Sequence, residues 1–169
     1  MPRVDDAAAI GPMHLQACLE TYPNSVLGID EAWIRQRWGK FATQEGTDHR
    51  QRLISDAQAN PDLLYRVAEA DEHIVGFVHA TRGQRKNVLA GLYTLAAYHG
   101  TGVGPEPMAD AEDFFDPALP SELEVAADNK RAIAFYEKFG FSVVAESEHL
   151  FSEKIPVVVM QRGPLGLPN

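Results

Sequence analysis

The sequence predicts an α/β (α+β) fold, in which a mixed, mostly antiparallel sheet of six to seven strands is flanked by about four helices. Two observations favour it: apolar residues recur every three or four positions in several stretches, and apolar and polar residues alternate in others. With 169 residues, of which 45% are hydrophobic, the chain can bury a full core. We therefore expect a single domain over residues 1–169, with 163–169 as a flexible tail.

Helical patterns come first along the chain. Ala7–Glu20 and Asp30–Trp38 have the spacing of amphipathic helices, and Asp48–Ala59 forms a third such pattern. The third helix is expected to stop at Asn60-Pro61, because proline lacks an N–H group and disfavours a helical residue before it.

Strand patterns follow these helices. Leu63–Glu69 and Ile74–Thr81 alternate between apolar and polar residues on either side of an Asp71-Glu72 turn. Val88–Leu95 comes after Gly83 and is the next strand of an antiparallel meander.

The third strand runs into a glycine-rich turn, in which Gly100, Gly102 and Gly104 alternate with other residues. Glycine allows positive φ and lets backbone N–H groups converge, and a helix that begins there adds a partial positive charge. Such a turn can hold a phosphate, although glycine turns between a strand and a helix are common.

A second informative stretch, residues 122–141, contains a strand, an Asx-rich break and a helix. Asp128 or Asn129 can cap the helix, and Gly140 fits the left-handed residue that ends it. The helix places apolar residues on one buried stripe: Ala132, Phe135, Tyr136 and Phe139. Two more strands are predicted over Ser142–Glu148 and Ile155–Gln161.

Together the two stretches resemble the acetyl-CoA site of the GNAT superfamily of N-acetyltransferases. That site has the pattern Arg/Gln-x-x-Gly-x-Gly/Ala, followed later by Asn-x-x-Ala-x-x-Phe-Tyr-x-x-x-Gly-Phe. The chain matches the later motif at Asn129, Ala132, Phe135, Tyr136, Gly140 and Phe141. The resemblance implies that acetyl-CoA is the cosubstrate and that a primary amine, on a small molecule or a peptide, attacks it directly in a ternary complex.

The resemblance also implies roles for individual residues. Those implied at the cofactor are Tyr93, Thr94 and Leu95 for the pantetheine arm, His99, Gly100, Thr101, Gly102, Val103 and Gly104 for the pyrophosphate, and Asn129, Arg131 and Ala132 at the start of the later helix. For Lys130 and Arg131 the alternative is a solvated first helical turn. The acceptor pocket is implied at Tyr22, Pro23 and Asn24, with the hairpin near residues 150–154 on its other side.

The acid and the base of the reaction differ in how well the sequence defines them. Tyr136 matches the residue that protonates the departing CoA thiolate, which a phenol of pKa about 10 can do at neutral pH. The alternative is a core aromatic residue. Some family members carry a glutamate base in the strand that here reads Val88-Leu89-Ala90, which has no carboxylate. Two alternatives remain for the base, Glu124 or a chain of water molecules. The alternation of residues does not decide on which face of the sheet Glu124 lies.

Two departures from the family pattern favour a second hypothesis. His99 stands where the family has Arg or Gln, and Pro105 and Pro107 remove two N–H groups near the predicted phosphate. The alternative function is therefore a GNAT-fold binding or regulatory module with weak or no CoA turnover.

Composition excludes several other classes of function. A net charge of −9 argues against nucleic-acid binding and suits a cationic substrate. No apolar run approaches the roughly 18 residues of a membrane span, and no secretory leader is apparent, so a cytoplasmic location is expected. Cys18 is expected in the core, and the scattered histidines predict no metal site. Homodimers are frequent in the family, which favours a dimer over a monomer.

Overall fold

The structure is a computed structural model that describes residues 2–101 and 105–165. Its helices are α1 (Ala7–Thr21), α2 (Glu31–Trp38), α3 (Gln44–Ala59), α4 (Pro105–Phe114) and α5 (Lys130–Glu137), with short 3-10 turns at Val4–Asp6, Gly39–Ala42 and Ala96–Tyr98. Its strands are β1 (Leu63–Ala70), β2 (His73–Arg82), β3 (Asn87–Thr94), β4 (Ser121–Ala126), β5 (Ser142–Phe151) and β6 (Ile155–Arg162).

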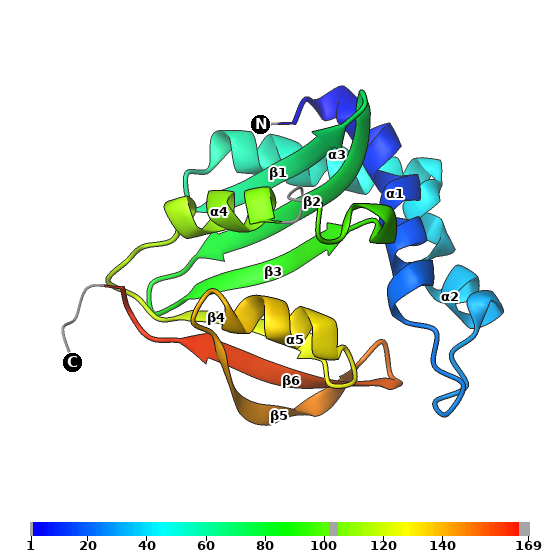
Figure 1. Cartoon of the computed structure of the whole chain (residues 1–169). Helices are drawn as coiled ribbons and strands as arrows, with labels where there is room; N and C mark the ends of the chain where they lie inside the picture. The colour runs from blue at the N-terminus through cyan, green and yellow to red at the C-terminus, as the bar shows by residue number, and fades with distance from the viewer. Residues whose placement is uncertain (1, 102–104, 166–169) are drawn as a thin grey trace. The chain divides into compact units, whose positions relative to one another are not determined.

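The strands form one mixed sheet in the order β1-β2-β3-β4-β6-β5 (Figure 1). β3 and β4 pair in parallel, from Asn87↔Ser121 to Leu89↔Leu123, whereas β6 is antiparallel to both β4 and β5. The predicted fold class is therefore confirmed, with six strands and five α-helices in the described part of the chain.

The chain divides into two compact units that share the long strands β2 and β3. Unit 1 contains the residues up to Ala80 and Gly91–Phe114, and unit 2 contains Thr81–Ala90 and the residues from Phe115 onward. The organisation as one domain stays a prediction, and most of the tail predicted at 163–169 lies outside the described residues.

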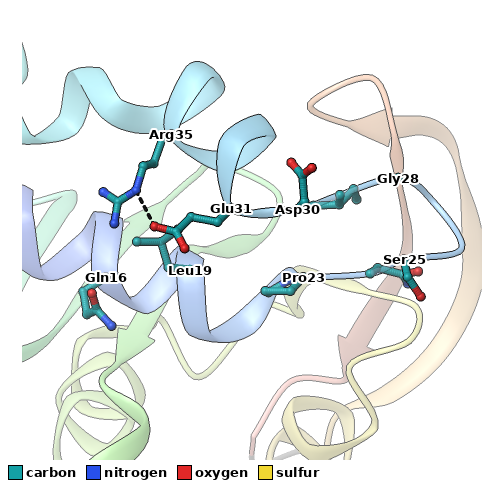
Figure 2. A pocket seen from close by; sticks show the side chains of 10 residues that line it. Gln16, Leu19, Pro23, Ser25, Gly28, Asp30, Glu31 and Arg35 are labelled. Atoms are coloured by element: carbon teal, nitrogen blue, oxygen red, sulfur yellow. Dashed lines mark hydrogen bonds and ion pairs between the residues drawn. The ribbon is translucent and has the colours of Figure 1, made fainter.

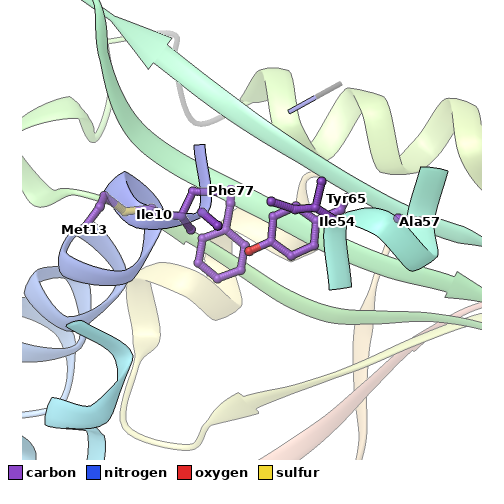
Figure 3. Close-up of a cluster of buried hydrophobic side chains, with 7 residues drawn as sticks. Ile10, Met13, Ile54, Ala57, Tyr65 and Phe77 are labelled. Atoms are coloured by element: carbon purple, nitrogen blue, oxygen red, sulfur yellow. The ribbon is translucent and has the colours of Figure 1, made fainter. Parts of the chain in front are cut away.

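The core of unit 1 lies between two helices and the β1–β2 hairpin (Figure 3). α1 contributes Ala7, Ile10 and Met13, α3 contributes Ile54 and Ala57, and the strands contribute Tyr65 and Phe77. The rings of Tyr65 and Phe77 stack with centroids 5.6 Å apart. Aromatic rings bury the most apolar surface per side chain, so this pair anchors the helices on the sheet. Cys18 is buried as expected.

Caps fix the starts of α2 and α3. The Asp30 carboxylate accepts from the Trp33 N–H at 2.8 Å, and the Thr43 hydroxyl accepts from the Gly46 N–H at 3.4 Å. α3 therefore begins at Gln44, four residues before the predicted start at Asp48. The apolar pattern missed its first turn because residues 44–47 are mostly polar, whereas the threonine cap already satisfies an N–H group there.

One glycine of α1 allows a close approach between backbones. A Cβ atom at Gly11 would overlap the carbonyl oxygen of Phe41. We expect Gly11→Ala to lower the free energy of unfolding by at least about 2 kcal/mol, since backbone atoms cannot move aside as a flexible side chain can. Urea denaturation measures this. The control is Gly39→Ala, which would meet nothing within 4 Å at a φ of −56° and should leave stability nearly unchanged.

Unit 2 shows how the predicted strand and helix around residue 129 are built. β4 buries Leu123 and Val125 and leaves Glu124 exposed. Asn129, not Asp128, caps α5, because its side-chain oxygen accepts from the Ala132 N–H at 3.1 Å. Gly140 has a φ of +81° and ends the helix as predicted.

The predicted apolar stripe of α5 is only partly buried. Tyr136 is 7% exposed, whereas Ala132, Phe135 and Phe139 are half-buried. Tyr136 is therefore more enclosed than the other three residues of the stripe.

Candidate active site

The loop between α1 and α2, implied as the acceptor element, is tightly folded. The Asn24 side chain accepts from the N–H groups of Val26 and Leu27 at 3.0 and 3.1 Å. Asn24 and Ile29 also exchange two backbone hydrogen bonds, at 2.8 and 2.9 Å, and Gly28 takes a φ of +61°. The loop therefore has a defined shape without help from a ligand.

A cavity of about 810 Å³ lies beside this loop, between α1 and α2 (Figure 2). Its lining residues are Gln16, Leu19, Pro23, Asn24, Ser25, Gly28, Ile29, Asp30, Glu31 and Arg35. Arg35 Nε donates to the Glu31 carboxylate at 2.7 Å, as the dashed line in Figure 2 shows. Asp30 is exposed at the start of α2. The cavity thus presents more carboxylate than cationic groups.

Tyr22 points elsewhere, although it was predicted together with Pro23 and Asn24. Its hydroxyl lies 3.0 Å from the hydroxyl of Tyr93, on β3, and its ring centroid lies 5.0 Å from that of Trp38. Tyr22 therefore connects the acceptor loop to the strand that is expected to hold the thioester, while Pro23 and Asn24 line the cavity.

Backbone groups at the end of β3 are not equally available to a cofactor. The Leu95 N–H donates to the Val75 carbonyl at 2.9 Å, and the Ala96 N–H donates to the Glu20 carboxylate at 2.7 Å. Neighbouring residues of a strand direct their backbone groups to opposite edges. Thr94 therefore directs its N–H away from β2, so that it is a better donor to a ligand than Leu95.

The side chain of His99 contacts the carbonyl group of Thr94, which points away from β2 as the Thr94 N–H does. Its Nε2 lies 2.9 Å from the Thr94 carbonyl oxygen, which can only accept, so Nε2 carries a proton. The N–H groups of His99 and Thr101 donate within the turn, at 3.1 and 3.4 Å, and Gly100 has a φ of +78°. The other predicted pyrophosphate residues, Gly102, Val103 and Gly104, lie outside the described residues.

The start of α5 carries the remaining residues predicted at the cofactor. The Ala132 N–H donates to the side-chain oxygen of Asn129, and the Asn129 amide nitrogen keeps its own two N–H donors. Lys130 donates to the Ala127 carbonyl at 3.1 Å, and Arg131 is exposed. A cofactor contact by Asn129 would therefore use its amide nitrogen and would leave the cap intact.

Two carboxylates of β4 differ sharply in their surroundings. Glu122 accepts from Lys86 Nζ at 2.5 Å and from Gln161 at 2.9 Å, and the hydrogen bond from Lys86 is the main cause that lowers the pKa of Glu122. Glu124 lies 3.2 Å from His149 Nε2 and accepts from the Ser147 hydroxyl at 3.4 Å. The depressed pKa makes Glu122 a poor proton acceptor.

Residues 2–101 and 105–165 contain neither a membrane-spanning helix nor a metal-binding cluster. No helix in the described ranges is both long and apolar enough to cross a bilayer. Within those ranges, the His, Cys, Asp and Glu side chains form no group of three or more that could hold a metal ion.

Comparison with known proteins identifies the class to which this fold and this site belong. Residues 31–141 match the model of the acetyltransferase (GNAT) family, which is more than half of the chain. The chain belongs to this family. The family expected from the two sequence motifs is therefore confirmed, and with it the enzyme class, N-acetyltransferase.

Individual relatives agree with this assignment. The chain is 28% identical over 118 residues to the spermidine N(1)-acetyltransferase of Thermoplasma acidophilum, an alignment that covers 67% of each protein. It shares the fold of the PaiA N-acetyltransferase of Thermoplasma acidophilum in complex with coenzyme A, with a TM-score of 0.72 and 22% identity over 96% of this chain and 95% of that one. It also resembles YncA of Salmonella typhimurium, solved with its cofactor acetyl-CoA, with a TM-score of 0.68 and 16% identity over 99% and 94% of the two chains.

Proposed function

We propose that the protein transfers an acetyl group from acetyl-CoA to a primary amine by direct attack in a ternary complex. The observation that carries this proposal is the family match together with α5, which is capped by Asn129 and buries the ring of Tyr136. Acetyl-CoA is the cosubstrate of this family, and two of the solved relatives hold coenzyme A or acetyl-CoA.

In this reaction the amine nitrogen attacks the thioester carbonyl carbon, and the oxyanion that forms accepts from a backbone N–H, for which Thr94 is our candidate. Glu124 takes the amine proton, directly or through water, because its carboxylate is exposed and Glu122 is held by Lys86. The carbon–sulfur bond then breaks, and the Tyr136 hydroxyl protonates the departing thiolate.

Among amines, we propose a polyamine as the acceptor. The relative from Thermoplasma acidophilum is a spermidine acetyltransferase, and this chain carries a net charge of −9. The cavity beside the acceptor loop adds the exposed carboxylate of Asp30, which suits an ammonium group of an extended cation, whereas the carboxylate of Glu31 is paired with Arg35.

A single substitution tests the cavity as the polyamine site. Asp30→Asn keeps the oxygen that caps α2 but removes the negative charge. We expect the KM for spermidine to rise about two- to fivefold, the range for an exposed charge pair, while the KM for a monoamine of similar length stays unchanged. Steady-state kinetics with both amines measure the difference. An equal rise of KM for both amines would contradict the proposal that this cavity binds the polyamine.

The proposed activity is tested by binding and by turnover. Calorimetry should detect acetyl-CoA binding, and a thiol-release assay over polyamines, amino acids, an aminoglycoside and peptide N-termini should find acceptors. Binding without thiol release for any amine would favour the alternative, a GNAT-fold binding module. His99 supports that alternative in part, since it already occupies the Thr94 carbonyl. The homodimer and the cytoplasmic location stay predictions, and size-exclusion chromatography tests the first.

A further inference from the structure

Unit 1 buries the charged side chain of an arginine. Arg50, on α3, is 6% exposed, and its two terminal nitrogens contact the Tyr65 hydroxyl at 2.8 Å and Nδ1 of His14 at 3.1 Å. Its guanidinium lies over the rings of Phe77 and Phe41, 5.4 and 6.0 Å from their centroids. Among the described residues Arg50 pairs with no carboxylate. A buried, unpaired charge is costly, so a specific task should offset that cost.

The arginine determines the state of His14. Arginine only donates hydrogen bonds, so Nδ1 of His14 must accept and the ring proton must sit on Nε2. Burial, and then the charge of Arg50, lowers the pKa of His14 to about 3, so the ring stays neutral throughout the pH range of an assay. Nε2 is buried and has no hydrogen-bond partner among the described residues. The contact with Arg50 is therefore the one hydrogen bond that orients this ring in the described part of the chain.

The oriented ring faces a residue of the candidate active site. His14 stacks on Phe41 at 4.4 Å, and its centroid lies 4.3 Å from that of Tyr93. The Tyr93 hydroxyl lies 3.0 Å from that of Tyr22, which belongs to the acceptor loop. A continuous series of contacts therefore runs from Arg50 to the loop, and all of it lies within unit 1.

We propose that Arg50 is a positioning residue for the amine acceptor: by fixing His14 against Tyr93 it holds the Tyr93–Tyr22 hydroxyl pair and, with it, the acceptor loop. The inference rests on the proposed function for the reaction that it serves. It assigns Arg50 no contact with substrate or cofactor.

The first test replaces the guanidinium by an apolar chain of similar length. Arg50→Met leaves Tyr65 and Nδ1 of His14 without their donor, and we expect the KM for the amine to rise about tenfold while kcat changes less than about threefold. Acetyl-CoA affinity, measured by calorimetry, should stay near wild type. The matched control is Arg52→Met, which removes the same charge from an exposed position on the same helix and should change neither constant. If Arg50→Met only destabilised the fold, the melting temperature would fall, but the KM for the amine would not rise while kcat stayed nearly constant.

A double-mutant cycle tests whether Arg50 acts through the hydroxyl pair. Tyr93→Phe keeps the ring beside His14 and removes the hydroxyl that contacts Tyr22, so it should raise the amine KM as Arg50→Met does. The double variant should have nearly the same amine KM as each single variant, because the first substitution already disrupts the arrangement of Tyr93 and Tyr22 that the second would disrupt. Fully multiplicative effects, or an amine KM that Arg50→Met leaves unchanged, would overturn the proposal.

A readout without turnover separates this inference from the proposed function. Trp33 and Trp38, the only tryptophans of the chain, lie on α2, and the Trp38 ring is 5.0 Å from that of Tyr22. Arg50→Met and Tyr93→Phe should alter the tryptophan emission alike, and Arg52→Met should not. An inactive wild type with these spectral changes contradicts the function but supports the network. An active wild type with identical spectra and kinetics in all variants contradicts the network alone.

Discussion

Tyr136→Phe is expected to lower the turnover number for acetyl transfer by about 10²-fold or more while acetyl-CoA affinity stays close to that of the wild type. The substitution keeps a ring that is 7% exposed and packs near Phe135 and Phe141, at centroid distances of 5.4 and 6.3 Å. It removes only the hydroxyl group, and with it the proton that the thiolate would take. Without that proton the CoA thiolate must leave as an anion or take its proton from water.

Pre-steady-state kinetics and calorimetry measure the two parts of this result. The melting temperature should change little, which confirms that the loss is chemical. Turnover equal to that of the wild type would mean that Tyr136 serves only the core of unit 2, the alternative that the sequence left open.

The second large effect is expected at Glu124. Glu124→Gln keeps an oxygen that can accept from Ser147 but cannot take a proton, so kcat should fall about 10²-fold, the lower end of the range for general-base catalysis. The comparison is Glu122→Gln, two residues away on the same strand. Glu122 is held by Lys86 and Gln161, so this variant should lose salt-bridge stabilisation and little activity.

Steady-state kinetics at one fixed pH, measured for both variants, distinguish a base from a structural carboxylate. The kcat should fall in Glu124→Gln and stay near that of the wild type in Glu122→Gln. If the two variants lose activity equally, neither carboxylate is the base, and a chain of water molecules takes the proton instead.

The sequence predicted the regular elements well, because each depends on contacts between residues close in the chain. The Asp71-Glu72 turn forms as expected, with φ values of 50° and 64°, and Gly140 ends α5. The predictions are wrong at the ends of some elements, where a single side chain determines at which residue a helix or strand begins or ends. β5 continues to Phe151, beyond the predicted Glu148, and α3 begins at the cap formed by Thr43.

The candidate site was predicted less completely, since its chemistry depends on residues that meet only in the folded chain. Arg50 and His14 are 36 positions apart and belong to no motif, so no sequence pattern indicated their contact. The sequence shows that His99 departs from the family pattern, but only the fold shows that its side chain contacts the Thr94 carbonyl. Alternation along the strand leaves the face of Glu124 open, and in the fold the burial of Leu123 and Val125 places Glu124 on the exposed face.

The division of the chain into two units has a consequence for how such an enzyme can diversify. The residues proposed for proton transfer, Glu124 and Tyr136, belong to unit 2, whereas the acceptor loop and its cavity belong to unit 1. Substitutions that change the preferred amine can therefore accumulate in one unit while the acid and the base are inherited unchanged in the other. Exchange of residues 21–30 between relatives is accordingly a direct route to new acceptor preferences.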